Sequence, residues 1–114
     1  MHYLTHLHDV QALDAAIAES RERLVLLFKH SRHCGTSFEA LDELNAHIER
    51  AEPGFVAYKM ITVQTHPAVS DAAAQKLGLR HETPQAILIR DGRIVWNASH
   101  YRITASQLDR AIGF

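Results

Sequence analysis

An unbroken apolar run, Leu24-Val25-Leu26-Leu27-Phe28, places the strongest constraint on how this chain can fold. Its length and continuous hydrophobicity are typical of a strand that is buried on both faces of a sheet. Polar residues and a glycine follow at once, and apolar residues then recur at helical spacing over residues 38–48, with acidic residues on the opposite face. The sequence therefore predicts a strand from about Arg23 to Phe28, a turn near Lys29 and an amphipathic helix beyond it.

Caps and chain breaks predict the remaining elements. The dipeptide Asp91-Gly92 is a strong signal for a tight hairpin, because both residues tolerate the positive φ of such a turn. The strand, helix and strand of the first half are expected to form a right-handed βαβ unit. In chain order the further elements are a helix from Asp9 to Arg21, a strand over residues 55–63, a helix from Pro67 to Leu77 with Gly78 as its C-cap, strands over residues 85–90 and 93–98, and a last helix opened by a capping box at Thr104–Gln107. The order αβαβαββα predicts one α/β domain over residues 1–114 with a central four-stranded mixed sheet.

Length and charge argue against several classes of function. A chain of 114 residues suits a single domain that needs neither disulfides nor metal to bury its core. The formal net charge is -1, with acidic and basic residues interspersed, so no basic surface for nucleic acid or an anionic membrane is expected. The first nine residues lack the basic start and apolar stretch of a secretory signal, and no apolar run is long enough to cross a bilayer. We expect a cytoplasmic protein, where a reducing environment keeps the single cysteine free.

Cys34, the only cysteine, stands where the predicted strand gives way to the predicted helix. Free N–H groups and the positive end of the helix dipole favour an anion at such a position, so a thiolate is favoured there. Lys29, Arg32 and His33 are candidate cationic neighbours. A free cysteine is more often a small buried hydrophobe, but the polar residues around this one are not typical of a core lining. We therefore interpret Cys34 as a reactive thiol.

Four neighbouring residues are candidates for tuning the thiolate: His33, Gly35, Thr36 and Ser37. Ser37 lies three residues along the helix on the same face, where its hydroxyl can donate to the sulfur, and the alternative is an ordinary first-turn serine. A protonated His33 would raise the thiolate fraction, and the alternative is an exposed loop residue without effect on Cys34. Lys29 and His30 are more simply interpreted as surface residues at the end of the strand.

Nine histidines raise the question of a metal site. His2, His6 and His8 lie in a terminus that is expected to fray. His30 and His33, beside the cysteine, lack the four-ligand spacing of a structural zinc site. No metal is therefore expected.

The position of the thiol after the first strand, with Thr83-Pro84 directly before the closing hairpin, is the arrangement of the thioredoxin-like fold. More specifically, the chain resembles the monothiol bacilliredoxins of the YtxJ type over nearly its whole length. After the cysteine, this chain has Gly35-Thr36 where the bacilliredoxin pattern has proline and an aliphatic residue. The likeness rests on Lys29-His30-Ser31, on Cys34 followed three residues later by Ser37, and on the segments 81–85, 96–100 and 103–104.

The resemblance implies that Cys34 is the redox cysteine and that Ser37 replaces the resolving cysteine of a thioredoxin. It also implies a cis peptide bond at Thr83-Pro84, which places the Thr83 backbone beside Cys34 as an edge for an extended substrate. Lys29 and His30, which match the spacing in the family, are the further candidates for substrate binding.

A chain with serine in the resolving position lacks the intramolecular exit of a dithiol reductase. A single thiolate can still take a small thiol from a mixed disulfide on a client protein and release the client reduced. The expected function is thus a monothiol oxidoreductase with bacillithiol or a related small thiol as co-substrate, no other cofactor, and oxidised client proteins and a recycling reductase as partners. Two alternatives stay open: an iron–sulfur carrier, because Cys34-Gly35-Thr36-Ser37 is one residue from the Cys-Gly-Phe-Ser motif of monothiol glutaredoxins, and a thioredoxin-like binding module without redox function.

Overall fold

The central sheet is organised around β2 (Leu24–His30), because every residue of this strand is buried. The computed structural model describes residues 4–113, in which β2 pairs in parallel with β3 (Val56–Thr62) on one side and antiparallel with β4 (Gln85–Arg90) on the other. β1 (Leu4–His6) extends the sheet in parallel beyond β3, and β5 (Arg93–Ser99) extends it antiparallel beyond β4. The strand order is β1-β3-β2-β4-β5.

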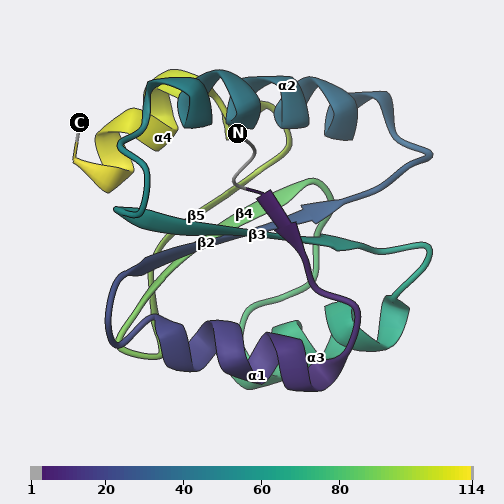
Figure 1. The fold of residues 1–114 in the computed structure, drawn as a ribbon. Coiled ribbons are helices and arrows are strands. Elements are labelled where there is room, and N and C mark those ends of the chain that lie inside the picture. Colours follow the sequence, from purple (N-terminus) through teal and green to yellow (C-terminus); the bar gives the residue numbers. More distant parts are fainter. Residues whose placement is uncertain (1–3, 114) are drawn as a thin grey trace.

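Two pairs of helices cover the two faces of this sheet and give the molecule three layers (Figure 1). α1 (Val10–Glu19) and α3 (Pro67–Leu77) lie on one face, and α2 (Gly35–Arg50) and α4 (Ala105–Ile112) lie on the other. A short 3-10 helix, η1 (His100–Arg102), leads from β5 into α4.

Side chains along β2 alternate between the two cores. Leu26 and Phe28 pack in the cluster that includes α2 and α4, while Val25 and Leu27 pack in the cluster that includes α1 and α3. Full burial of one such side chain contributes about 1.5–3 kcal/mol. The apolar run Leu24–Phe28 therefore anchors both helical layers.

The predicted four-stranded sheet is wrong in one respect, because the structure has a 5-stranded sheet. The additional strand, β1, is 3 residues long, too short to show a hydrophobic period in the sequence. Its Leu4 lies opposite Tyr58 of β3 and is buried, which fastens the segment to the sheet. His6 therefore belongs to a paired strand and not to a frayed terminus, while His2 lies outside the described residues.

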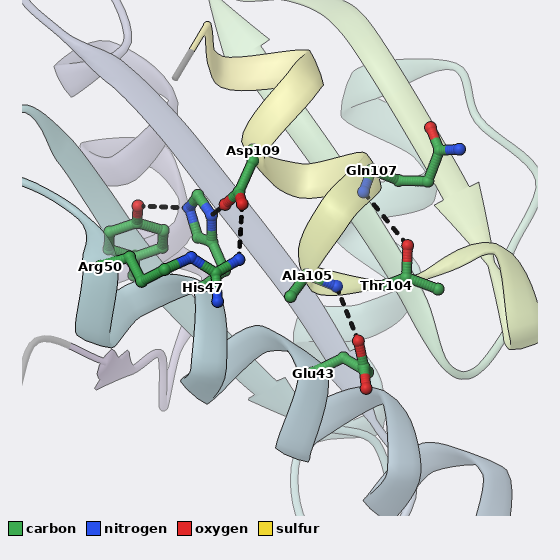
Figure 2. A network of polar contacts seen from close by, with 8 residues as sticks. Glu43, His47, Arg50, Thr104, Ala105, Gln107 and Asp109 are labelled. Atoms are coloured by element: carbon green, nitrogen blue, oxygen red, sulfur yellow. Dashed lines mark hydrogen bonds and ion pairs between the residues drawn. The ribbon is translucent and has the colours of Figure 1, made fainter.

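The α/β class and the order of the other elements are confirmed. Gly78 ends α3 in the left-handed region with φ 65°, and Asp91 and Gly92 form the hairpin turn with φ of 54° and 75°. Thr104 caps α4, since its hydroxyl oxygen accepts a hydrogen bond from the N–H of Gln107 (Figure 2). Local turn chemistry thus acts in the structure as the sequence predicts.

A polar network fastens α4 to the C-terminal half of α2 (Figure 2). The ring of His47 is fully buried, with Nδ1 at 2.6 Å from Oδ1 of Asp109 and Nε2 at 2.8 Å from the hydroxyl of Tyr58. Arg50 donates to Oδ2 of the same carboxylate. Desolvation opposes the charge of Asp109, but the hydrogen bonds from His47 and Arg50 outweigh it and lower the pKa of this carboxyl. The ionised Asp109 therefore holds the last helix in place.

Replacing Asp109 by Asn removes the charge that faces the buried His47 ring. A hydrogen bond to a charged group contributes about 1.5–3 kcal/mol, so Asp109→Asn is expected to lower the free energy of unfolding by roughly this amount at neutral pH. Because the folded pKa is depressed, this stability is present above the unfolded pKa and is lost as pH falls through the folded value. The difference between variant and wild type should therefore shrink in acid.

Urea unfolding at a series of pH values measures both effects. Asp42→Asn, on the exposed face of α2, is the matched control and should change little. An equal loss in the control, or a difference that persists undiminished in acid, would contradict the assignment.

Candidate functional site

Cys34 occupies the N-cap position of α2, a helix of 16 residues. Its backbone is extended, with φ -121° and ψ 118°, and its carbonyl accepts a hydrogen bond of 3.0 Å from the N–H of Ser37. The residue is half-buried and its thiol is free. No acidic side chain lies in the first turn of α2, so nothing there offsets the preference of a helix N-terminus for an anion. The predicted placement of the thiol at the strand-to-helix junction is confirmed.

Ser37 is fully buried and holds the turn that carries the cysteine. Its Oγ accepts a hydrogen bond of 2.9 Å from the N–H of Ser31 and lies 2.8 Å from Nδ1 of His30. Within residues 4–113, no hydrogen bond joins this hydroxyl to the sulfur of Cys34. Ser37 therefore braces the turn that carries Cys34, whereas the sequence analysis considered a hydrogen bond from its hydroxyl to the thiolate.

His30 and Lys29 are not the surface residues that the sequence analysis favoured. β2 continues through both of them, His30 is 5% exposed, and Lys29 is fully buried. Burial lowers the pKa of His30, and the charges of Arg32 and His6 lower it further. The prediction failed because each polar side chain has partners inside the protein, which a strand-end position in the sequence does not reveal.

Lys29 points to the opposite face of the sheet from His30, toward α3 and the segment before Pro84. Its Nζ donates to the carbonyl of Ser70 at 3.1 Å and lies 3.1 Å from Nδ1 of His81. Burial lowers the pKa of the Lys29 amine, and the nearby Asp71 opposes that shift. Burial and the charge of Lys29 also lower the pKa of His81. A buried ammonium thus braces the loop that leads to β4.

The peptide bond between Thr83 and Pro84 is cis, as the resemblance implied. Gln85, the next residue, pairs with Lys29 across β2 and β4, so this bond and the Cys34 turn lie at the same edge of the sheet. Thr83 is half-buried and Pro84 is buried. The carbonyl of Pro84 accepts a hydrogen bond of 3.1 Å from the N–H of His100, which has φ 56°. His100, for which the sequence suggested no role, therefore ties η1 to the cis-proline loop.

The residues directly around the cysteine differ in how firmly they are held. His33 and Gly35 are exposed, and a Cβ added at Gly35 would meet nothing within 4 Å. Oγ1 of Thr36 lies 3.5 Å from the hydroxyl of Tyr101. Thr36 and Tyr101 line a groove of about 330 Å³ between α2 and η1. The acidic residues Glu39 and Glu43 also line this groove.

Two large aromatic residues near the thiol were not singled out from the sequence. Tyr101 is 77% exposed, and Phe38, which was counted on the apolar face of the helix, is 48% exposed. The ring of Phe38 meets that of His30 edge-on, with centroids 4.8 Å apart. Its position four residues after Cys34 is the one sequence signal that could have singled out Phe38.

Neither a metal cluster nor a membrane span is found in the part of the chain that the structure describes. Residues 4–113 contain no group of three or more His, Cys, Asp or Glu side chains arranged to hold a metal ion. None of the described helices is long and apolar enough to span a bilayer.

Comparison with known proteins agrees with this geometry. The chain matches the family model described as monothiol bacilliredoxin BrxC over residues 5–108. A solved structure whose description gives it a thioredoxin fold has 31% sequence identity and a TM-score of 0.83, covering 96% of this chain and 93% of that one. Thioredoxin from Fasciola hepatica has 18% identity and a TM-score of 0.73, covering 95% of both chains. Chloroplastic thioredoxin z has 20% identity and a TM-score of 0.75, covering 99% of this chain and 94% of that one. The expected thioredoxin-like fold is confirmed.

The buried Lys29 amine makes stability depend on pH in a specific direction. Its folded pKa lies below the ordinary value of 10.5, so the unfolded chain binds more protons between these two values. The contribution of Lys29 to stability therefore rises with pH across this window. We expect the stability of Lys29→Met relative to wild type to be lowest near about pH 10 and higher near about pH 7.

Thermal unfolding of both proteins across this range measures the effect. Lys76→Met is the control, because the side chain of Lys76 is 40% exposed and should show no such trend. A difference between Lys29→Met and wild type that does not vary with pH would show that Lys29 is not a buried charge.

Gly35 lies at a position in α2 that favours proline. It is the first residue of α2, a position that suits proline, and the extended backbone of Cys34 is the conformation that a following proline requires. Because nothing lies within 4 Å of an added Cβ, Gly35→Pro is expected to stabilise the protein by about 0.4–1 kcal/mol through the unfolded chain. Calorimetry measures this, with Gly35→Ala as the matched control. A lower melting temperature for Gly35→Pro would mean that the turn needs glycine.

Proposed function

This chain belongs to the monothiol bacilliredoxin family, and on that premise we propose that it removes a low-molecular-weight thiol, bacillithiol, from mixed disulfides on client proteins. The general assignment as a monothiol redox protein follows from the family match over residues 5–108 and from the single cysteine. The observation that carries the finer proposal is the placement of Cys34. It lies at the start of α2, with the cis bond Thr83–Pro84 at the same sheet edge and a buried serine three residues on.

The proposed step is a thiol–disulfide exchange at Cys34. The thiolate of Cys34 attacks the small-thiol sulfur of the mixed disulfide, the bond to the client sulfur breaks, and the client leaves as a thiolate that takes a proton from water. Cys34 then carries the small thiol as a new disulfide. A second molecule of the small thiol attacks this disulfide, forms the oxidised small-thiol dimer and restores Cys34. The net reaction converts the mixed disulfide and one free small thiol into the reduced client and the oxidised small-thiol dimer, so the free small thiol is the reductant.

Ser37 makes this external recycling necessary. The residue stands where a second cysteine would resolve the adduct, and its oxygen is engaged by Ser31 and His30. A hydroxyl cannot enter thiol–disulfide exchange, so the adduct persists until another thiol or a partner reductase arrives. Such recycling needs a supply of reduced thiols, which favours the cytoplasm as the place of action.

The client is proposed to lie along the cis-proline loop. The half-buried Thr83 precedes β4 at the sheet edge where Cys34 stands. Main-chain groups of that loop can pair with an extended peptide without reading its side chains, which suits an enzyme that must accept several clients.

Intact-mass analysis tests the proposal. A model client carrying a bacillithiol mixed disulfide is incubated with the protein in the absence of free thiol. We expect the client to lose the mass of one bacillithiol and the protein to gain it, in equal amounts. Cys34→Ser should abolish both changes.

Ser37→Cys is a matched variant for the resolving step. It restores a second thiol at the third position after Cys34, so its bacillithiol adduct should give way to an intramolecular disulfide without any added thiol. Loss of bacillithiol from the client in the Cys34→Ser variant, or no adduct on the wild-type protein, would overturn the proposed function.

A further inference from the structure

A hollow beside the cysteine turn has the chemistry of an anion site. It measures about 470 Å³ and lies where β1, β2 and β3 end. We call it the Arg32 hollow. Its lining includes His6, His30, Arg32, Phe38 and Thr62.

Every ionisable side chain that lines the Arg32 hollow is basic: His6, His30 and Arg32. Within residues 4–113, Arg32 forms no ion pair with a carboxylate. Its backbone is fixed, because its N–H donates to Oε1 of Gln64 at 2.9 Å. The charges of Arg32 and His6, after burial, lower the pKa of His30, which indicates that the three groups share one electrostatic neighbourhood. An anion in the hollow would relieve that repulsion.

The walls of the hollow suit a small organic anion. Phe38, 48% exposed, supplies an apolar face near Cys34, and Thr62 supplies a hydroxyl. Guanidinium binds a carboxylate with two parallel hydrogen bonds. The groove between α2 and η1 is the contrasting case, because Glu39 and Glu43 line it and would repel an anion.

The strand order places the two flanks of Cys34 on opposite sides. β2 lies between β3 and β4, and Cys34 follows the end of β2. The cis-proline loop precedes β4 on one side, whereas the Arg32 hollow follows β3 and β1 on the other. A mixed disulfide has two unlike halves, so a site with two unlike flanks can hold both at once.

We propose that the Arg32 hollow binds the carboxylate-bearing part of the small thiol, and so holds its sulfur at Cys34 while the client lies against the Thr83–Pro84 loop. This inference rests on the proposed function. In the exchange step, binding in the Arg32 hollow determines which sulfur is attacked. Cys34 attacks the small-thiol sulfur, and the client sulfur leaves toward the opposite flank.

Two aromatic disulfides of different charge test this assignment. The second-order rate constant of Cys34 is measured with 5,5′-dithiobis(2-nitrobenzoate), which carries carboxylates, and with uncharged 2,2′-dithiodipyridine. The ratio of the two constants cancels any change in the thiolate itself. Arg32→Gln is expected to lower this ratio at least about threefold. Arg102→Gln removes an exposed cation of η1 and is expected to leave the ratio nearly unchanged.

Binding of succinate gives a readout that does not depend on the reactivity of Cys34. The ring resonances of His6 and His30 should shift in a saturable manner with added succinate, and Arg32→Gln should abolish the shifts. Unaltered shifts in Arg32→Gln, or equal losses of the rate ratio in Arg32→Gln and Arg102→Gln, would overturn the anion site while leaving the proposed function intact. Succinate binding at the hollow together with a Cys34 that reacts with neither disulfide would support the anion site and overturn the proposed function.

Discussion

Burial of β2 on both faces forces the polar residues at its carboxyl end to find partners inside the protein. A charged or polar side chain withdrawn from water costs several kcal/mol if it is left unpaired. Lys29 meets this demand with Ser70 and His81 on one face, and His30 meets it with Ser37 on the other. The strand thereby reaches the sheet edge without fraying, and the cysteine that follows it starts from a rigid support.

The start of α2 at Cys34 adds an electrostatic preference to this support. The N–H groups of the first turn and the helix dipole favour an anion, and no acidic side chain in that turn opposes them. The cis-proline loop is held separately, by the contact of Lys29 with His81 and by the hydrogen bond from the N–H of His100 to the carbonyl of Pro84. The sulfur of Cys34 and the loop proposed to hold the client are therefore positioned by different contacts.

Much of this arrangement was predictable from the sequence, because it depends on local rules. The apolar run of β2, the spacing of α2, the Asp91-Gly92 turn and the cap at Thr104 each act over a few neighbouring residues. β1 was missed because 3 residues carry no period, and it forms only because β3 offers an edge.

The inward orientation of Lys29 and His30 was missed for a related reason. Their partners lie in α3, in the loop before β4 and in α2, and sequence alone did not place those segments beside the end of β2. Family resemblance marked the same positions as important but carried no information on where the side chains point. Phe38 is the reverse case. The helical spacing of apolar residues suggested that it is buried, but it is exposed because the start of α2 extends beyond the core.

The alternation of side chains along β2 has a consequence for how such a protein can diverge. Lys29 acts on the α3 side of the sheet and His30 on the α2 side, so the two braces share no contact in the described part of the chain. Because the two braces have no partner in common there, a change in the partners of one leaves the hydrogen bonds of the other in place. Descendants of this fold can therefore alter the cis-proline loop and the turn that carries the sulfur in separate steps, keeping one inherited while the other drifts.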